Sequence, residues 1–141
     1  MRPFLLFSVM LFTGISAFAQ NCTLDIAVSG MHSDKGTCYL SLYHSDKGFP
    51  KDPKAAFRLA YASIVNGIST FRFEKIPSGS YAVACYHDEN GNHKLDNNFF
   101  GIPTEGTGTS NNATGFFGPP KFKDAKFLLQ RDTALTIRIR Y

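Results

Sequence analysis

The chain has 141 residues, of which 43% are hydrophobic and 18% are charged, and its formal net charge is +4. This length fits one ordinary domain, and the hydrophobic share is large enough to form a core without dense cross-links. The positive charges form no block and no aromatic-basic RNA motif accompanies them, which argues against nucleic-acid binding.

The first residues have the pattern of an export signal. Arg2 supplies a positive charge, residues 4–18 are mostly apolar, and Ala17-Phe18-Ala19 is a small-x-small cleavage pattern. The apolar stretch is shorter than the roughly 20 residues of a spanning helix, so a membrane anchor is the weaker alternative. We therefore expect a signal peptide over residues 1–19 and one exported domain over residues 20–141. That domain would be periplasmic or extracellular, with no membrane span after cleavage.

The chain contains three cysteines, Cys22, Cys38 and Cys85. An odd count in an oxidising compartment is compatible with one disulfide and one thiol. Cys38 and Cys85 lie in strand-like runs, however, where Cys commonly behaves as a small hydrophobic residue. We expect buried thiols rather than a bridge, and the spacings match no zinc pattern.

Alternating apolar residues predict two strands at the start of the domain. Their inward positions are Leu24, Ile26 and Val28 in the first strand, and Cys38, Leu40 and Leu42 in the second. Residues 45–58 then form an irregular crossover, in which Asp52-Pro53 is placed to cap one helical turn.

The clearest hairpin joins residues 59–65 to residues 68–74 through Asn66-Gly67. Asn-Gly between apolar runs favours a type I′ turn, because both residues tolerate positive φ. Paired in one sheet, the two strands would place Ala62 opposite Phe71 and Ala60 opposite Phe73.

Three further strands are predicted at residues 81–87, 125–130 and 133–141, the last with Leu135, Ile137 and Ile139 on one face. Seven short strands without a long helix predict an all-β fold. We expect a seven-stranded antiparallel β-sandwich of transthyretin-like or immunoglobulin-like type.

Residues 97–124 show neither strand nor helix periodicity, and connections of this length are usually functional or disordered. Several Phe side chains in this range would be costly to leave in water. We therefore expect one long ordered loop that packs over one end of the sandwich.

Oxygen-bearing side chains recur directly after His87. Asp88, Asn90 and Asn92 match positions one, three and five of an EF-hand loop, Lys94 offers its carbonyl at seven, and Asp96 matches nine. His93 stands where that loop has Gly, and Phe99 where it has a bidentate Glu, a role open to Glu105 if the chain folds back. The pattern predicts calcium at Asp88, Asn90, Asn92, Lys94, Asp96 and Glu105, with a dissociation constant of about 10⁻⁴ to 10⁻³ M. The alternative is an Asx-rich turn closed by its own hydrogen bonds.

Several motifs of the second half are similar to one family. His87-Asp-Glu-Asn-Gly-Asn-His-Lys-Leu-Asp96, Asn98-Phe-Phe-Gly-Ile-Pro-Thr-Glu105 and Phe117-Gly-Pro-Pro120 resemble small secreted bacterial proteins grouped as a domain of unknown function, DUF2141. Members of that family commonly have Gly in place of His93. The Pro77-Ser-Gly-Ser-Tyr81 turn is similar to that of transthyretin-like, carboxypeptidase-regulatory β-sandwiches. The resemblance implies an exported β-sandwich and no assigned activity.

These patterns favour a non-enzymatic exported binding or envelope module. Flat aromatic rings beside amides suit carbohydrate or peptide ligands, and the contact candidates are Phe99, Phe100, Asn111, Asn112, Phe116 and Phe117. One alternative is a metal-dependent hydrolase that uses His87 and His93. Another is a purely structural or adhesion module whose Phe-Gly-Pro-Pro region only seals the core. No set of nucleophile, base and orienting group can be assembled from the sequence.

Overall fold

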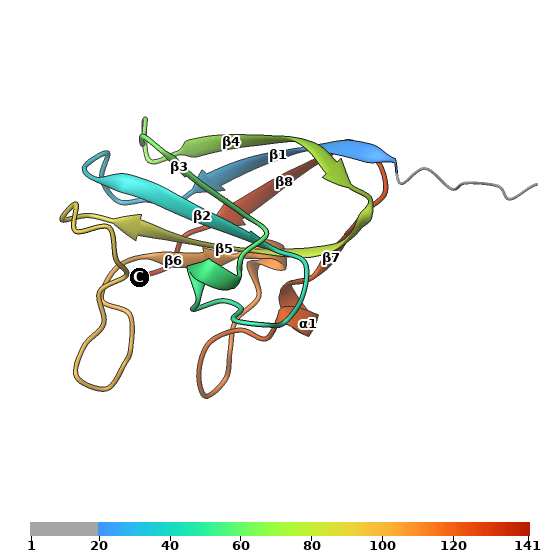
Figure 1. The fold of residues 1–141 in the computed structure, drawn as a ribbon. Helices are drawn as coiled ribbons and strands as arrows, with labels where there is room; N and C mark the ends of the chain where they lie inside the picture. The colour runs from blue at the N-terminus through green and yellow to red at the C-terminus, as the bar shows by residue number, and fades with distance from the viewer. Residues whose placement is uncertain (1–19) are drawn as a thin grey trace, which may run out of the picture.

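The computed structural model describes residues 20–141, and the predicted signal peptide lies outside them. Eight strands form two sheets that face each other, which confirms the predicted β-sandwich with one strand more than expected (Figure 1). One sheet has the order β4-β1-β8, and the other has the order β3-β2-β5-β6 with β7 paired to β5. In the described part of the chain, no helix has the length and apolar character needed to cross a membrane.

The three-stranded sheet contains β1 (Asn21–Ser29), β4 (Ser69–Pro77) and β8 (Thr133–Arg138). β1 runs antiparallel to β4 and parallel to β8, so the sandwich is not antiparallel throughout. The chain reaches β8 from β7 of the other sheet over residues 130–132, so β1 and β8 are not joined by a hairpin.

The five-stranded sheet contains β2 (Thr37–Tyr43), β3 (Arg58–Ala62), β5 (Gly79–Asp88), β6 (Thr107–Thr109) and β7 (Phe127–Leu129). β5 is its longest strand and pairs with β2, β6 and β7. The short helices are η1 (Pro53–Ala55), η2 (Ser110–Asn112) and α1 (Phe122–Ala125). The predicted cap of the crossover is confirmed, because the Asp52 side chain accepts a hydrogen bond from the Lys54 N–H at 3.0 Å.

The core of the described residues fills the space between the two sheets. The alternating residues of β1, β2 and β8 point into it as predicted, and the most deeply buried include Leu24, Ile26, Val28, Leu40, Leu42 and Ile137. All three cysteines are free and buried among them, as expected. Burial raises the pKa of the Cys38 thiol to about 12, so this group behaves as an apolar side chain.

The turn at Asn66-Gly67 is confirmed, with φ of +53° and +72° and with Val65 paired to Ile68 across it. The predicted pairing of the flanking strands is wrong. β3 pairs with β2 and β4 pairs with β1, so the chain changes sheet here. Ala62 therefore lies opposite Cys38 and not Phe71. Separate sheets allow the apolar faces of both strands to meet across the sandwich, which a shared sheet does not.

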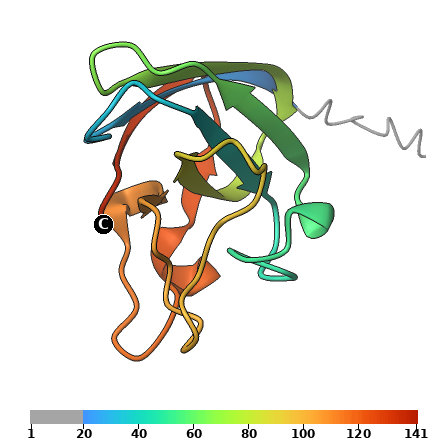
Figure 2. The ribbon, with the colours of Figure 1, turned by 90° about the vertical axis from the view of Figure 1, so that its left-hand side faces the viewer.

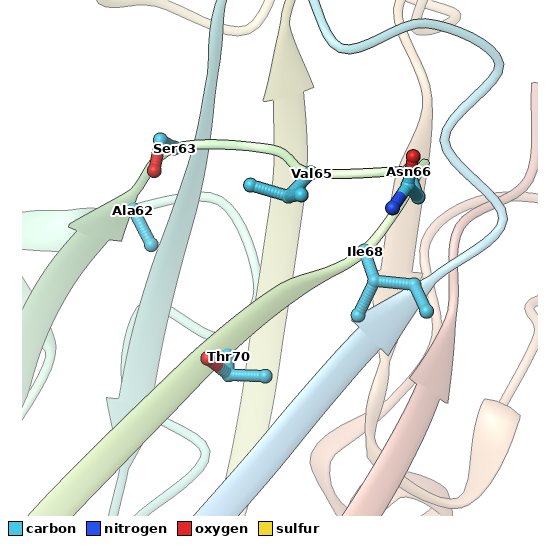
Figure 3. A pocket seen from close by; sticks show the side chains of 6 residues that line it. All are labelled: Ala62, Ser63, Val65, Asn66, Ile68 and Thr70. Atoms are coloured by element: carbon cyan, nitrogen blue, oxygen red, sulfur yellow. The ribbon is translucent and has the colours of Figure 1, made fainter.

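A shallow pocket lies in the fork where β3 and β4 separate (Figure 3). Its lining consists of Ala62, Ser63, Val65, Asn66, Ile68 and Thr70. None of these side chains is charged, so the pocket offers apolar and weakly polar contacts without acid–base chemistry.

The predicted long loop is divided by β6, η2 and α1 into two loops, residues 89–106 and 113–121. Both project from the same side of the sandwich, away from the three-stranded sheet (Figures 1 and 2). The exposed fractions of Phe99, Phe100, Phe116 and Phe117 are 98%, 83%, 91% and 95%. The expected packing of these rings over one end is therefore not observed, because strand residues already fill the core.

Candidate functional site

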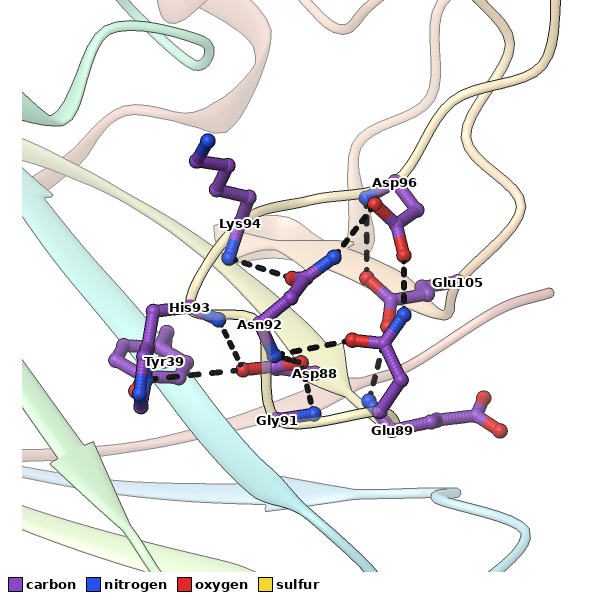
Figure 4. Close-up of polar contacts among 10 residues, drawn as sticks. Tyr39, Asp88, Glu89, Gly91, Asn92, His93, Lys94, Asp96 and Glu105 are labelled. Carbon is purple, nitrogen blue, oxygen red and sulfur yellow. Dashed lines mark hydrogen bonds and ion pairs between the residues drawn. The ribbon is translucent and has the colours of Figure 1, made fainter.

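β5 ends in a turn that is built around the carboxylate of Asp88 (Figure 4). Its Oδ1 accepts hydrogen bonds from the N–H groups of Gly91 (2.9 Å) and Asn92 (3.2 Å), and its Oδ2 accepts one from His93 (2.9 Å). The Asp88 side chain has no exposed surface. Three N–H donors compensate the buried charge, so residues 88–93 fold around this one group. We call residues 88–96 the Asp88 turn.

Asp96 closes the other end of the Asp88 turn. Its Oδ1 accepts from Asn92 Nδ2 at 2.8 Å, and its Oδ2 accepts from Asn90 Nδ2 at 2.6 Å. The amide oxygens of Asn90 and Asn92 in turn accept from the N–H groups of Asn92 (3.0 Å) and Lys94 (2.9 Å). The predicted oxygens therefore converge, and each already receives an N–H donor.

Glu105 folds back onto the Asp88 turn. It is 6% exposed, its Oε1 accepts from the N–H of Glu89 at 2.9 Å, and its Oε2 accepts from the N–H of Asp96 at 3.1 Å. One carboxylate thus joins the start and the end of the turn. Because it lies directly before β6, it also fixes the first loop to the sheet.

His93 has a φ of +63°, in the left-handed region where an EF-hand loop has Gly. A residue with a Cβ is disfavoured there by about 1 kcal/mol or more relative to Gly. The His93 ring is exposed, and its Nδ1 is hydrogen-bonded to the hydroxyl group of Tyr39. At this one position the backbone has the left-handed conformation that an EF-hand loop achieves with glycine.

Within residues 20–141, no group of three or more His, Cys, Asp and Glu side chains could hold a metal ion. A cation at the Asp88 turn would need amide and backbone oxygens as well. In the structure the amide nitrogens of Asn90 and Asn92 donate to Asp96, and their amide oxygens accept from backbone N–H groups. The turn is thus closed by hydrogen bonds, and a cation there would require these amides to turn their oxygens toward Asp96.

His87 is fully buried, and both of its ring nitrogens have partners. Nε2 donates to the carbonyl oxygen of Lys35 at 2.6 Å, and Nδ1 accepts from the hydroxyl group of Tyr141 at 2.7 Å. These bonds attach the last residue of the chain to the ends of β2 and β5. The His87 ring therefore has no exposed nitrogen, and both of its nitrogens are bonded within the protein.

His32 and Glu89 extend this cluster at the protein surface. His32 Nε2 lies 3.0 Å from Glu89 Oε2, and the centroids of the His32 and Tyr141 rings are 3.9 Å apart. The sequence analysis missed both His32 and Tyr141. Their contacts join residues more than one hundred positions apart, and no local pattern indicates such a contact.

Asn111 and Asn112 lie at the base of the second loop. Asn111 Nδ2 donates to the carbonyl oxygens of Asp124 (3.2 Å) and Lys126 (2.9 Å), and Asn112 Oδ1 accepts from the N–H of Arg138 (2.9 Å). Both predicted contact amides are therefore used to hold the loop in place.

Ser110 completes this base beneath the sheet. It is 1% exposed, its hydroxyl group accepts from the Val83 N–H at 2.9 Å, and it donates to the Ala125 carbonyl oxygen at 2.6 Å. The second loop is thus attached to β5 and α1 by a neutral hydroxyl and to α1 and β8 by neutral amides.

Each loop contains the same short motif, Phe-Phe-Gly-x-Pro. Its copies are Phe99-Phe100-Gly101-Ile102-Pro103 and Phe116-Phe117-Gly118-Pro119-Pro120. We call these segments the Phe tips. The two rings of each pair pack edge to face, with centroids 5.6 Å apart in the first and 4.6 Å in the second. Both glycines have positive φ, +76° and +152°. A comparison of the loop with itself would have found this motif from the sequence.

Local contacts fix the conformation of each Phe tip. In the first, Asn98 Oδ1 accepts from the N–H groups of Phe100 (2.9 Å) and Ile102 (3.0 Å). In the second, a Cβ on Gly115 would lie 1.8 Å from the carbonyl oxygen of Gly118, so the close approach requires glycine. The exposed rings are therefore held by defined turns.

Three tyrosines form a row on the outer face of the five-stranded sheet, also missed from the sequence. Tyr39 lies opposite Tyr61 and Tyr86 on its two neighbouring strands, with ring centroids 5.9 Å and 5.2 Å away. Burial, followed by the charge of Asp88, raises the pKa of Tyr86 to about 12. Because His93 contacts Tyr39, the Asp88 turn borders this row.

Searches found no match to this chain among curated proteins and none among solved structures. The sequence model of one family, described as "Uncharacterized protein conserved in bacteria (DUF2141)", matches residues 26–137. The match includes residues of all eight strands, the Asp88 turn and both Phe tips. The chain therefore belongs to the DUF2141 family of bacterial proteins.

Proposed function

We propose that this protein is an exported, non-enzymatic binding module of the cell envelope that contacts its partner through the two Phe tips. The observation that supports this most is the exposure of four phenyl rings, 83% to 98%, on loops with hydrogen-bonded bases. Exposed apolar groups gathered on one side of a protein mark interaction sites. Each ring would contribute about 1.5–3 kcal/mol if buried in the core, so the fold forgoes that stabilisation at both tips.

The remaining parts of the proposal rest on separate observations. Export is supported by the charge, apolar stretch and cleavage pattern of residues 1–19. The absence of catalysis is supported by the structural use of both His87 nitrogens. It is also supported by the carboxylates of Asp88 and Glu105, which accept backbone N–H donors and are poorly placed to act as bases.

We also propose that calcium can close the Asp88 turn, held by Asp88, Asn90, Asn92, the Lys94 carbonyl, Asp96 and Glu105. Support comes from the order of the oxygens, from the left-handed backbone at His93 and from the return of Glu105 to the turn. A bound ion would stiffen the base of the first Phe tip and leave the second base unchanged.

Thermal melting with and without calcium tests this site. With a dissociation constant of about 10⁻³ M, about 10 mM calcium should stabilise the fold by about 1.4 kcal/mol, which is a rise of several degrees in Tm. Asp96→Asn removes a ligand charge and should abolish the rise, and magnesium serves as the ion control. If the wild type melts at the same temperature in both buffers, the calcium proposal fails and the Asx turn remains.

The contact role of the Phe tips is tested by sedimentation with isolated bacterial envelope fractions. We expect the wild type to sediment with them and a variant with Phe99, Phe100, Phe116 and Phe117 changed to Ser to stay in solution. The matched control is Leu59→Ser with Tyr61→Ser, which removes exposed apolar surface elsewhere. Equal sedimentation of the tip variant and the wild type would contradict the proposed function.

A further inference from the structure

We propose that the partner of the Phe tips is an anionic lipid bilayer, and that both tips insert into its headgroup region. This inference rests on the proposed function, because it names the partner of the same surface.

The shape favours a partner that is uniform over a wide area. The two Phe tips are separate convex projections on the same side of the sandwich (Figures 1 and 2). They have the same Phe-Phe-Gly sequence, so each presents the same chemistry to whatever lies in front of it. A single binding pocket would accommodate only one of two separate tips, whereas a bilayer presents the same environment to both.

The chemistry of the tips also fits lipid better than sugar. Residues 97–104 and 113–120 contain no charged side chain. A sugar site needs fixed polar groups beside the ring. The side-chain oxygen Oδ1 of Asn98 and the side-chain amide of Asn111 are instead bonded within the loops and their bases. The headgroup region of a bilayer binds aromatic rings that insert into it and needs no fixed polar partner beside them.

The charges beside the second tip match an anionic surface. Lys121 and Lys123 directly follow this tip, and both are exposed. Asp124 offsets one of these charges. At the first tip, Lys94 lies within the Asp88 turn beside the carboxylates of Asp88 and Asp96, so that base has no positive excess. Without Arg2 of the predicted signal peptide, the formal net charge falls from +4 to +3 and stays positive. Two rings per tip give only weak apolar insertion, and stable attachment requires a second contribution. The lysines supply it through attraction to acidic lipids.

The test is co-sedimentation of residues 20–141, the chain expected after signal cleavage, with phosphatidylcholine vesicles that include or lack phosphatidylglycerol. We expect binding only to the anionic vesicles. Phe99→Ser with Phe100→Ser, and Phe116→Ser with Phe117→Ser, should each lower the partition coefficient at least about tenfold. Lys121→Glu with Lys123→Glu should lower it on the order of tenfold. The Leu59→Ser, Tyr61→Ser control should bind as the wild type does.

A fluorescence measurement keeps the test decisive if a Ser variant folds poorly. The chain contains no Trp, so Phe117→Trp places a single reporter at the second tip. Its emission should shift to the blue, and become protected from iodide, when anionic vesicles are added. An unchanged emission in the presence of excess anionic vesicles would overturn the inference.

The other outcomes separate this inference from the proposed function. If the wild type ignores vesicles but binds insoluble cell-wall polysaccharide through the tips, the lipid partner is wrong and the proposed function stands. If binding to vesicles is equal in the wild type and in both tip variants, the lipid inference is overturned. If binding to vesicles, polysaccharide and envelope fractions is independent of the tips throughout, both fail.

Discussion

The two projecting loops share the Phe-Phe-Gly tip but differ at their bases, by which we mean the hydrogen-bonded residues that join each loop to the sandwich. In the first, carboxylates of Asp88 and Glu105 collect backbone N–H groups. In the second, the hydroxyl of Ser110 and the amides of Asn111 and Asn112 make the equivalent contacts. The comparison shows that the two Phe-Phe-Gly tips are held by different local contacts and stand on different bases. Under the proposed calcium site, only the first base would bind a cation.

The largest expected difference between the bases is their sensitivity to loss of one side chain. Asp88→Ala leaves three N–H groups without their buried acceptor and should lower the free energy of unfolding by about 3 kcal/mol. Asn111→Ala removes two exposed amide contacts and should lower it by about 1 kcal/mol. Urea unfolding of both variants measures the difference. Equal losses would show that the carboxylate is not the organising group of the first base.

Removal of the unfavourable left-handed conformation at His93 should also affect the stability of the two bases differently. His93→Gly removes the left-handed penalty and should raise the free energy of unfolding by about 1 kcal/mol. Asn111 has a φ of +59°, but Asn111→Gly also loses two amide contacts, so we expect no gain there. Thermal melts of both variants provide the measurement. A loss of stability in His93→Gly would mean that the contact with Tyr39 outweighs the backbone penalty.

The first base should further be the alkali-sensitive one, because Tyr86 lies beside it. The pKa of Tyr86 is raised to about 12, so the folded state keeps a proton that the unfolded state loses near pH 10. The stability that this tyrosine contributes is therefore complete below about pH 10 and is lost as the pH rises toward 12. Tyr86→Phe should reduce the fall in Tm over this range. An identical fall in the variant would place the sensitivity on the other tyrosines.

The smallest effects on stability are expected at the tips themselves. Phe99→Ala and Phe116→Ala should each change the free energy of unfolding by no more than about 0.5 kcal/mol, because the rings are exposed. Phe73→Ala, in the core at 8% exposed, is the matched control and should lower it by about 3–5 kcal/mol. A comparable loss at Phe99 or Phe116 would support the alternative in which this region seals the core.

Local patterns predicted much of the fold. The alternation in β1, β2 and β8 identified the inward side chains, and the Asn66-Gly67 turn followed from its two residues. The sequence did not predict the sheet to which each strand belongs, because Ala60 and Ala62 fit opposite β2 as well as opposite β4. The pairing of each strand depends on how the apolar faces of all strands pack together.

Some features of the candidate site were likewise predictable from the sequence, and others were not. The convergence of Asp88, Asn90, Asn92 and Asp96 was predictable from spacing, since alternate residues of a tight turn face one point. The internal use of Asn111 and Asn112 was not, because their acceptors and donor lie in α1 and β8. The row of tyrosines likewise depends on strand register, which the sequence left open.

The exposure of both Phe tips on anchored loops is the claim on which the proposed function depends, and quenching of single Trp reporters tests it most directly. In the free protein, Phe100→Trp and Phe117→Trp should both emit at the wavelength of solvated indole and be quenched by iodide almost as readily as free Trp. Phe73→Trp provides the buried reference. Blue-shifted, protected emission at either tip position would contradict the account, because it would place that tip inside the fold.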